Sequence, residues 1–226
     1  MSLKIHPKAK IHPSAILEGD VEIGEGTVVG PFVYILGPVV IGSHNQISSH
    51  VVIGEEPEHR SKKGQGWIRI GDHNSIREYV AIQRSTGETD TEIGDHCYLM
   101  DRSQIAHDCV LEDHVTFSSH VILGGHCRVL EGATLGIGTM AHQWSTIGSY
   151  TMTGMGSVIT KDIFPFALVK GNPARYARWN THVFAKLGIV ESQIRFSSGR
   201  YSSSNPTADA LFERFYQFQK RTLLSV

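Results

Sequence analysis

Aliphatic side chains recur at every sixth residue over most of the chain. A period of six fits neither the 3.6-residue turn of an α-helix nor the two-residue alternation of a simple strand. It fits a short strand followed by a corner, with the aliphatic residue facing a narrow interior. Three such units return the chain above its own start after about eighteen residues, so that successive coils pair as parallel strands about 4.8 Å apart. The run comprises Ile5, Ile11, Leu17, Ile23, Val29, Ile35, Ile41, Ile47 and Ile53, then Ile70, Ile76 and Ile82, and then Ile93, Leu99, Ile105, Leu111, Phe117, Leu123, Val129, Leu135, Ala141, Ile147, Thr153 and Ile159.

The remaining positions of the repeat suit a tight corner. Gly often follows the aliphatic residue, as at Gly24 and Gly136, and a small or β-branched residue often stands four positions after it, as at Ala15 and Val33. Gly relaxes the backbone where side chains would crowd. We therefore predict an all-β fold, a parallel β-helix of hexapeptide repeats. An ordinary β-sandwich is the alternative.

Two segments, residues 55–67 and 85–92, interrupt the period. Loops that interrupt a solenoid tend to gather at its binding face, although surface insertions are also tolerated without a function. The first contains Arg60, Lys62 and Lys63.

The repeat ends after Ile159, so we place the β-helix domain at residues 1–164 and a C-terminal helical region at residues 165–226. Asn180 is a candidate N-cap for a helix that runs to Leu187 and stops at Gly188. A Ser-rich link follows. Asn205-Pro206 then opens a second helix with an apolar face formed by Leu211, Phe212, Phe215 and Phe218.

Composition narrows the function. Lys plus Arg (21) nearly balances Asp plus Glu (22), so no global field favours nucleic acid or an anionic membrane. The N-terminal residues lack the apolar core of a signal peptide, and no apolar stretch is long enough to span a membrane. The three cysteines lack metal-type spacing, and we interpret them as reduced core residues of a cytoplasmic protein.

Histidine is abundant, and one histidine is out of phase. Seven share one position of the repeat, typical of outward corner residues: His44, His50, His73, His96, His114, His120 and His126. His107 breaks that phase and precedes Asp108. His107, His126 and His142 lie on successive coils along one edge, and His107, Gly125 and Gln143 share one column. This set suits acyl transfer, with His107 as a general base, Asp108 as its partner and the Gly125 N–H as an oxyanion donor.

In these motifs the chain resembles the UDP-N-acetylglucosamine acyltransferase (LpxA) family. The matching segments are Ile76-Arg77-Glu78 with Arg84, Ile105-Ala106-His107-Asp108-Cys109, Gly124-Gly125-His126, His142-Gln143, and Gly171-Asn172 followed by Asn180. The resemblance implies a left-handed β-helix with a C-terminal helical region, a homotrimer, and active sites between subunits. It implies transfer of a hydroxyacyl chain from acyl carrier protein to the 3-position of UDP-N-acetylglucosamine, the first step of lipid A synthesis. No bound cofactor is expected, since the acyl group arrives on the phosphopantetheine of the carrier.

The resemblance also assigns residues. His107 matches the general base, Asp108 its partner and Gly125 the oxyanion donor. The matched substrate contacts are His126, His142, Gln143, Asn180 and Lys186, and no metal ligand is expected. Met155 stands where a bulky residue shortens the acyl pocket, which predicts a preference for chains of about ten carbons. Gln83 and Gln104 replace histidines of better-known members, His182 replaces an acidic residue and the C-terminal region is shorter, which leaves a 3-amino sugar open as the acceptor.

Three other functions compete with this one. Gly171-Asn172-Pro173-Ala174-Arg175 resembles the exit segment of acetyl-CoA-dependent sugar acetyltransferases on the same fold. His107 and His126 resemble part of a three-histidine zinc site of the γ-class carbonic anhydrases. A non-catalytic scaffold is the third. For the carrier protein, which is acidic, basic landing residues are expected among Arg60, Lys62 and Lys63 in the first interruption and Lys220 and Arg221 in the tail.

Overall fold

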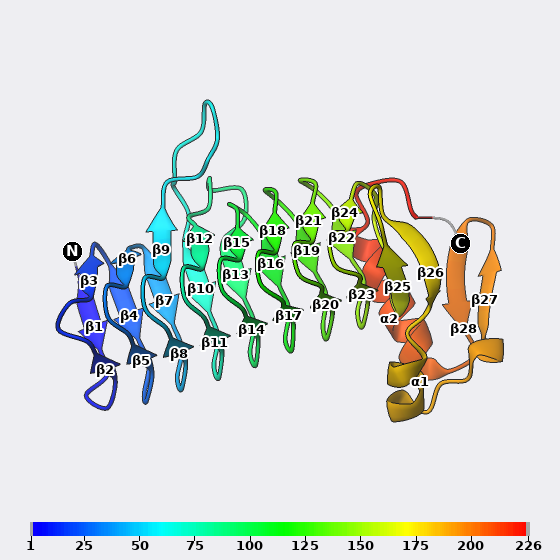
Figure 1. Cartoon of the computed structure of the whole chain (residues 1–226), viewed down its shortest axis with the longest axis horizontal. Coiled ribbons are helices and arrows are strands. Elements are labelled where there is room, and N and C mark those ends of the chain that lie inside the picture. The colour runs from blue at the N-terminus through cyan, green and yellow to red at the C-terminus, as the bar shows by residue number, and fades with distance from the viewer. Residues whose placement is uncertain (1, 225–226) are drawn as a thin grey trace.

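The computed structural model describes residues 2–224 and consists mainly of three parallel sheets wound around one axis (Figure 1). The first sheet contains β1 (Leu3–Ile5), β4 (Val21–Ile23), β7 (Val39–Ile41), β10 (Ile68–Ile70), β13 (Thr91–Ile93), β16 (Val110–Leu111), β19 (Arg128–Val129) and β22 (Thr146–Ile147). The second contains β2 (Lys10–Ile11), β5 (Val28–Val29), β8 (Gln46–Ile47), β11 (Ser75–Ile76), β14 (Tyr98–Leu99), β17 (Thr116–Phe117), β20 (Thr134–Leu135), β23 (Met152–Thr153), β25 (Ala167–Lys170) and β26 (Arg175–Trp179). The third contains β3 (Ile16–Glu18), β6 (Tyr34–Leu36), β9 (Val52–Glu55), β12 (Ala81–Gln83), β15 (Gln104–Ile105), β18 (Ile122–Leu123), β21 (Met140–Ala141) and β24 (Val158–Ile159).

The strand register confirms the predicted coil. Ile105 pairs in parallel with Leu123, which pairs with Ala141, each one coil further along the axis. The aliphatic positions of the repeat are buried in the interior from Ile23 onward and partly buried in the first coil, and Phe117 is among the largest fully buried side chains. The predicted parallel β-helix is therefore the observed architecture, because each coil buries its aliphatic residues only by stacking on its neighbours.

The corners use backbone that most residues avoid. All seven in-phase histidines have φ between 56° and 61°, in the left-handed region. We call the three corner columns the first edge (first to second sheet, including His114), the second edge (second to third sheet, including His120) and the third edge (third to first sheet, including His126). On the first edge the rings of His44, His73, His96 and His114 stack with centroids 5.0 Å apart.

The three sheets form the sides of a triangular prism. Both interruptions of the repeat leave this prism at the third edge. Residues 56–67 connect β9 to β10, and residues 84–90 connect β12 to β13. Figure 1 shows the first of them as the long loop that projects beyond β9. Both loops therefore lie at the edge that carries His107, and their place at a binding face stays a prediction.

The C-terminal region caps the last coil. β25 continues the second sheet beside β23, and β26 returns antiparallel to it. After β26 come α1 (Thr181–Leu187), a 3-10 turn (Glu191–Gln193), the hairpin β27 (Ile194–Ser197) and β28 (Arg200–Ser203), and α2 (Pro206–Phe218). The Ser-rich segment expected to be a link thus forms most of a hairpin. The division at residue 164 stays a prediction.

Both predicted helices are present, but their caps differ. α1 ends at Gly188 with φ 64°, and the Asn205 side chain accepts a hydrogen bond from the Ala208 amide at the start of α2. The Asn180 side chain does not cap α1, because its Nδ2 donates to the Tyr150 carbonyl instead. Within residues 2–224 no helix has the length and apolar character needed to cross a bilayer.

Candidate active site

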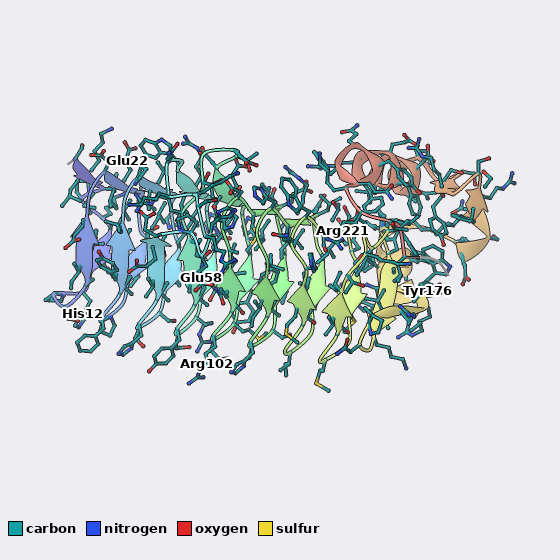
Figure 2. The ribbon with its side chains drawn as sticks, turned by 90° about the horizontal axis from the view of Figure 1, so that it is seen from above. His12, Glu22, Glu58, Arg102, Tyr176 and Arg221 are labelled. Carbon is teal, nitrogen blue, oxygen red and sulfur yellow. The ribbon has the colours of Figure 1, made fainter. Side chains whose placement is uncertain are left out.

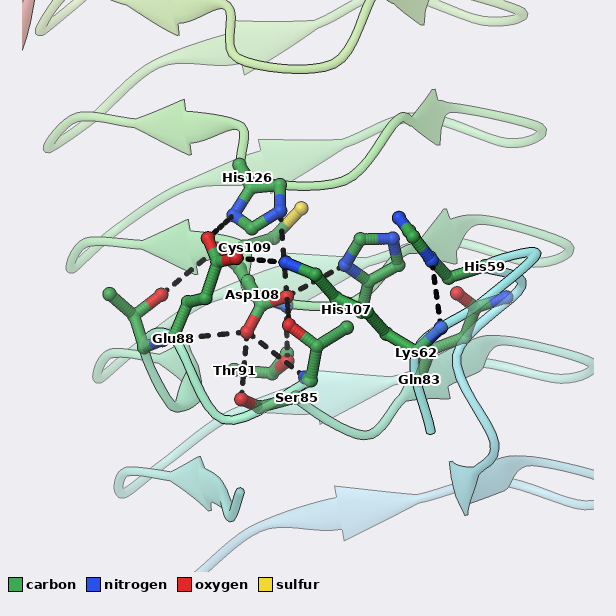
Figure 3. Close-up of polar contacts among 12 residues, drawn as sticks. His59, Lys62, Gln83, Ser85, Glu88, Thr91, His107, Asp108, Cys109 and His126 are labelled. Atoms are coloured by element: carbon green, nitrogen blue, oxygen red, sulfur yellow. Dashed lines mark hydrogen bonds and ion pairs between the residues drawn. The ribbon is translucent and has the colours of Figure 1, made fainter. Parts of the chain in front are cut away.

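The centre of the candidate site is a tight pair of neighbouring residues on the third edge. His107 follows β15, and its Nδ1 lies 2.7 Å from Asp108 Oδ2 (Figure 3). Both residues are at least 95% buried. An ionised carboxylate only accepts, so Nδ1–H donates to Asp108 and the lone pair of the imidazole is on Nε2. This is the arrangement that a general base requires.

Asp108 is held by the second interrupting loop. Its Oδ1 accepts from Ser85 Oγ at 2.7 Å and from the Thr86 amide at 3.1 Å, and its Oδ2 accepts from Thr86 Oγ1 at 2.8 Å. Burial opposes ionisation, but hydrogen bonds from Ser85, His107 and Thr86 outweigh it and hold the pKa of Asp108 below its ordinary value. Sequence reasoning did not find Ser85 and Thr86, since two hydroxyl residues in a loop give no signal of their partner.

Gly125 lies directly against the His107 ring. A Cβ added at Gly125 would be 2.5 Å from His107 Cε1 and 2.8 Å from Nε2. Among residues 2–224 the amide of Gly125 donates to no group, although the residue is buried. A buried, unengaged N–H beside the basic nitrogen fits the predicted oxyanion donor.

His126 extends the site one coil along the axis. Its Nε2 lies 3.7 Å from Asp108 Oδ2, and its ring is perpendicular to that of His107, with centroids 5.1 Å apart. On its other side it stacks on Trp144 with centroids 3.8 Å apart. Burial is the main cause that lowers the pKa of His126 below its ordinary value, against the opposing charge of Asp108. Sequence reasoning missed Trp144, which occupies the same corner position one coil further on.

Three residues of the site could also hold a metal ion, as the zinc alternative requires. His107, Asp108 and His126 each present a ligand atom, and these atoms lie within 4.8 Å of one another. The close His107–Asp108 hydrogen bond, however, engages the carboxylate oxygen that a metal would need.

His142 and Gln143 lie on the next coil, where both are exposed and both are contacted by Arg221 of the C-terminal tail. Arg221 Nη1 is 2.8 Å from His142 Nδ1 and donates to the Gln143 carbonyl at 3.0 Å. The tail is fixed by Asp162, whose Oδ2 accepts from the amides of Lys220 and Arg221 at 2.7 and 2.6 Å. Arg221, expected to meet the carrier protein, thus contacts two of the predicted substrate residues, at the place where the β-helix meets the C-terminal region (Figure 2).

Three predicted residues lie away from this edge. Asn180 and Lys186 line a separate cavity of about 860 Å³ with Tyr150 and Met152. Met155 follows β23 on the second edge and is 76% exposed. A single chain therefore does not bring the predicted nucleotide contacts and the predicted chain-length residue to His107.

Comparison with known proteins identifies this combination of fold and site. The fold and the His–Asp site define a hexapeptide-repeat transferase, and the family model "Bacterial transferase hexapeptide (six repeats)" matches residues 2–37, 22–55 and 90–125. Acyl-[acyl-carrier-protein]--UDP-N-acetylglucosamine O-acyltransferase of Stutzerimonas stutzeri is 41% identical over 89% of this chain and 83% of its own length. The enzyme of the same name from Halorhodospira halophila is 41% identical over 82% and 80%. The chain belongs to the UDP-N-acetylglucosamine O-acyltransferase family.

Solved structures agree with the sequence comparison. UDP-N-acetylglucosamine O-acyltransferase (LpxA) from Moraxella catarrhalis has a TM-score of 0.78 at 28% identity, with 99% of this chain and 98% of that chain covered. LpxA from Acinetobacter baumannii has a TM-score of 0.74 at 30% identity, with 98% and 99% covered. The predicted left-handed β-helix with its short helical appendage is confirmed by this likeness.

Proposed function

We propose that this protein transfers a (hydroxy)acyl chain from acyl carrier protein to the 3-position of UDP-N-acetylglucosamine or a related UDP-amino sugar, the first step of lipid A synthesis. The observation that carries the proposal is the buried pair of His107 and Asp108 beside the free amide of Gly125. A base, a group that orients it and an oxyanion donor are the three parts that transfer from a thioester requires.

The reaction follows from these positions. His107 Nε2 takes the proton from the 3-hydroxyl or 3-amino group as that group attacks the thioester carbonyl carbon. The Gly125 N–H stabilises the negative oxygen that forms, and Asp108 stabilises the imidazolium. When the carbon–sulfur bond breaks, the imidazolium returns the proton to the departing phosphopantetheine thiolate. All atoms and protons are thereby accounted for without a bound cofactor or metal.

A homotrimer completes the site in this proposal. The cavity of Asn180 and Lys186 lies apart from the third edge, so a neighbouring copy must bring its nucleotide contacts to His107. Exposed apolar side chains on the second and third sheets and the second edge support a buried partner face, since monomers rarely expose such groups together. They are Ile122 (40%), Ile137 (50%), Met140 (45%), Met152 (42%) and Met155 (76%).

The donor and the location complete the proposal. Acyl carrier protein is acidic, and Arg60 and Lys63 in the loop are exposed. Lys62 forms an ion pair with Glu88 and is less available to a partner. We place the reaction in the cytoplasm, where the buried thiols of Cys97, Cys109 and Cys127 stay reduced.

A turnover panel tests the proposal. Acyl carrier proteins loaded with chains of different length, with and without a 3-hydroxyl, and acetyl-CoA are each offered with UDP-N-acetylglucosamine and its 3-amino analogue. Product should form from acyl carrier protein, and His107→Ala should lower kcat by at least about a hundredfold, the usual contribution of a general base. Turnover with acetyl-CoA alone would make the protein an acetyltransferase, and full activity of His107→Ala would refute the assigned base. Metal analysis of the purified protein tests the zinc alternative.

A further inference from the structure

The first interrupting loop places a second imidazole against the catalytic base. His59 of this loop meets the His107 ring edge to face, with centroids 5.6 Å apart and planes at 79°. Figure 3 shows His59 on the side of His107 opposite Asp108 and His126. Since Nδ1 of His107 faces Asp108, the basic Nε2 is directed to the His59 side. The group that gives up its proton must therefore approach beside His59.

The loop is fixed at the residue before His59. The Glu58 amide donates to Gln83 Oε1 at 3.2 Å, and Gln104 Nε2 donates to Glu58 Oε2 at 3.4 Å. An ion pair between Lys62 and Glu88 ties the same loop to the second interruption. Gln83 and Gln104, the two departures noted in the sequence, thus hold the segment that carries His59.

Hydrogen bonds also define the tautomer of the neutral His59 ring. Its Nδ1 accepts from the amides of Ser61 at 3.3 Å and Lys62 at 3.0 Å. A nitrogen that accepts carries no hydrogen, so the neutral ring carries its hydrogen on Nε2. His59 is exposed, and its Nε2–H donates to no group among residues 2–224. The site therefore contains a fixed, unengaged donor next to the base.

We propose that His59 binds the acceptor sugar by donating its Nε2–H to an oxygen next to the attacking group. The inference rests on the proposed function, because it takes the substrate to be a sugar with hydroxyl and amide oxygens. His59 and His107 then have complementary roles, since one nitrogen donates to the sugar and the other accepts its proton. Gln83 and Gln104 act through Glu58 as positioning residues for this contact.

Steady-state kinetics on the full-length protein, with acyl carrier protein as donor and UDP-N-acetylglucosamine and its 3-amino analogue as acceptors, test this contact. His59→Phe keeps the planar ring but removes both nitrogens, and His59→Gln keeps an N–H at a similar reach. One hydrogen bond corresponds to about a two- to tenfold change in binding. The acceptor KM of His59→Phe should rise by that factor with the donor KM unchanged, and His59→Gln should recover part of the loss. Ser61→Ala is the matched control, because Ser61 is an exposed neighbour whose backbone amide still donates to His59 after the change.

Two further variants separate this inference from the proposed function. Glu58→Ala removes the side-chain contact with Gln104 but keeps the backbone bond to Gln83, so it should raise the acceptor KM in the same direction by a smaller factor. An unchanged acceptor KM in His59→Phe, or an equal rise in the donor KM, would overturn the assignment. His107→Ala is measured alongside: an inactive His107→Ala with a normal His59→Phe refutes only the role of His59, whereas a fully active His107→Ala refutes the proposed base itself.

Discussion

Replacing Asp108 with Asn tests the arrangement of the catalytic pair most directly. In the wild type, five donors converge on the carboxylate, from Ser85, from the amide and the hydroxyl of Thr86, from His107 and, at 3.5 Å, from the Thr89 amide. An amide offers only one oxygen, which is sufficient for Ser85 and the Thr86 amide. Its NH₂ then faces His107 Nδ1, which can only accept from it. The hydrogen of the imidazole moves to Nε2, and the base loses its lone pair on the reacting side.

The size of the effect follows from the bonds lost. To react, the variant must return the hydrogen to Nδ1, where it meets a donor inside a buried site. This forfeits a hydrogen bond to a charged group, about 1.5–3 kcal/mol, and leaves a buried donor unsatisfied at about 1–3 kcal/mol. The sum of roughly 3–6 kcal/mol corresponds to a loss of about 10²- to 10⁴-fold in kcat.

Kinetics across pH provides the assay. Raising the pH should not restore the variant, because its fault is the position of a hydrogen and not an excess of protons. Asp113→Asn is a matched control, since Asp113 accepts from the Asp95 amide on the first edge, away from the site. A kcat for Asp108→Asn within about threefold of wild type would refute the reasoning, given the size expected of a general base.

The same residue predicts a stability effect in acid. The pKa of Asp108 is lowered in the folded state, with burial opposing and hydrogen bonds from Ser85, His107 and Thr86 prevailing. Its contribution to stability is present above the unfolded pKa, about 3.9, and is lost as pH falls through the folded pKa. Thermal unfolding of the wild type should therefore show a loss below about pH 4 that Asp108→Asn lacks. If the melting temperatures of the two proteins fell by the same amount below pH 4, the lowered pKa of Asp108 would be contradicted.

Three other variants probe the rest of the site. Gly125→Ala introduces a Cβ 2.5 Å from the His107 ring and should lower kcat by about a hundredfold. Circular dichroism should show that the fold is kept, and normal turnover would mean that the His107 ring can shift without loss of activity. Met155→Gly should shift the preference from about ten carbons towards longer chains, since Met155 lies roughly 2.7 coils or about 13 Å along the axis from His107. If the variant prefers the same chain length as the wild type in the donor panel, Met155 does not limit the length of the acyl chain. Arg60→Glu with Lys63→Glu should raise the carrier-protein KM and weaken its salt dependence, and an unchanged KM at low salt would exclude the loop as the landing surface.

The repeat in the sequence was sufficient to predict the prism, because a period of six leaves few ways to bury the aliphatic residues. It also predicted that His107, Gly125 and His126 share an edge, since stacking of whole coils fixes which residues are neighbours. Both C-terminal helices were readable from Gly188 and Asn205, because caps are local signals. Their order and contacts with the prism were not.

Only the tertiary structure decided how the edge becomes a site. Ser85 and Thr86 reach Asp108 because a loop folds back over the prism. The sequence alone does not indicate which group a hydroxyl residue in a loop will contact. His59 likewise meets His107 only through the fold of an irregular segment, held by Gln83 in the prism wall. Periodic sequence determines the scaffold, since its contacts repeat with the chain. The loops that complete the chemistry have no period, so their contacts become visible only in three dimensions.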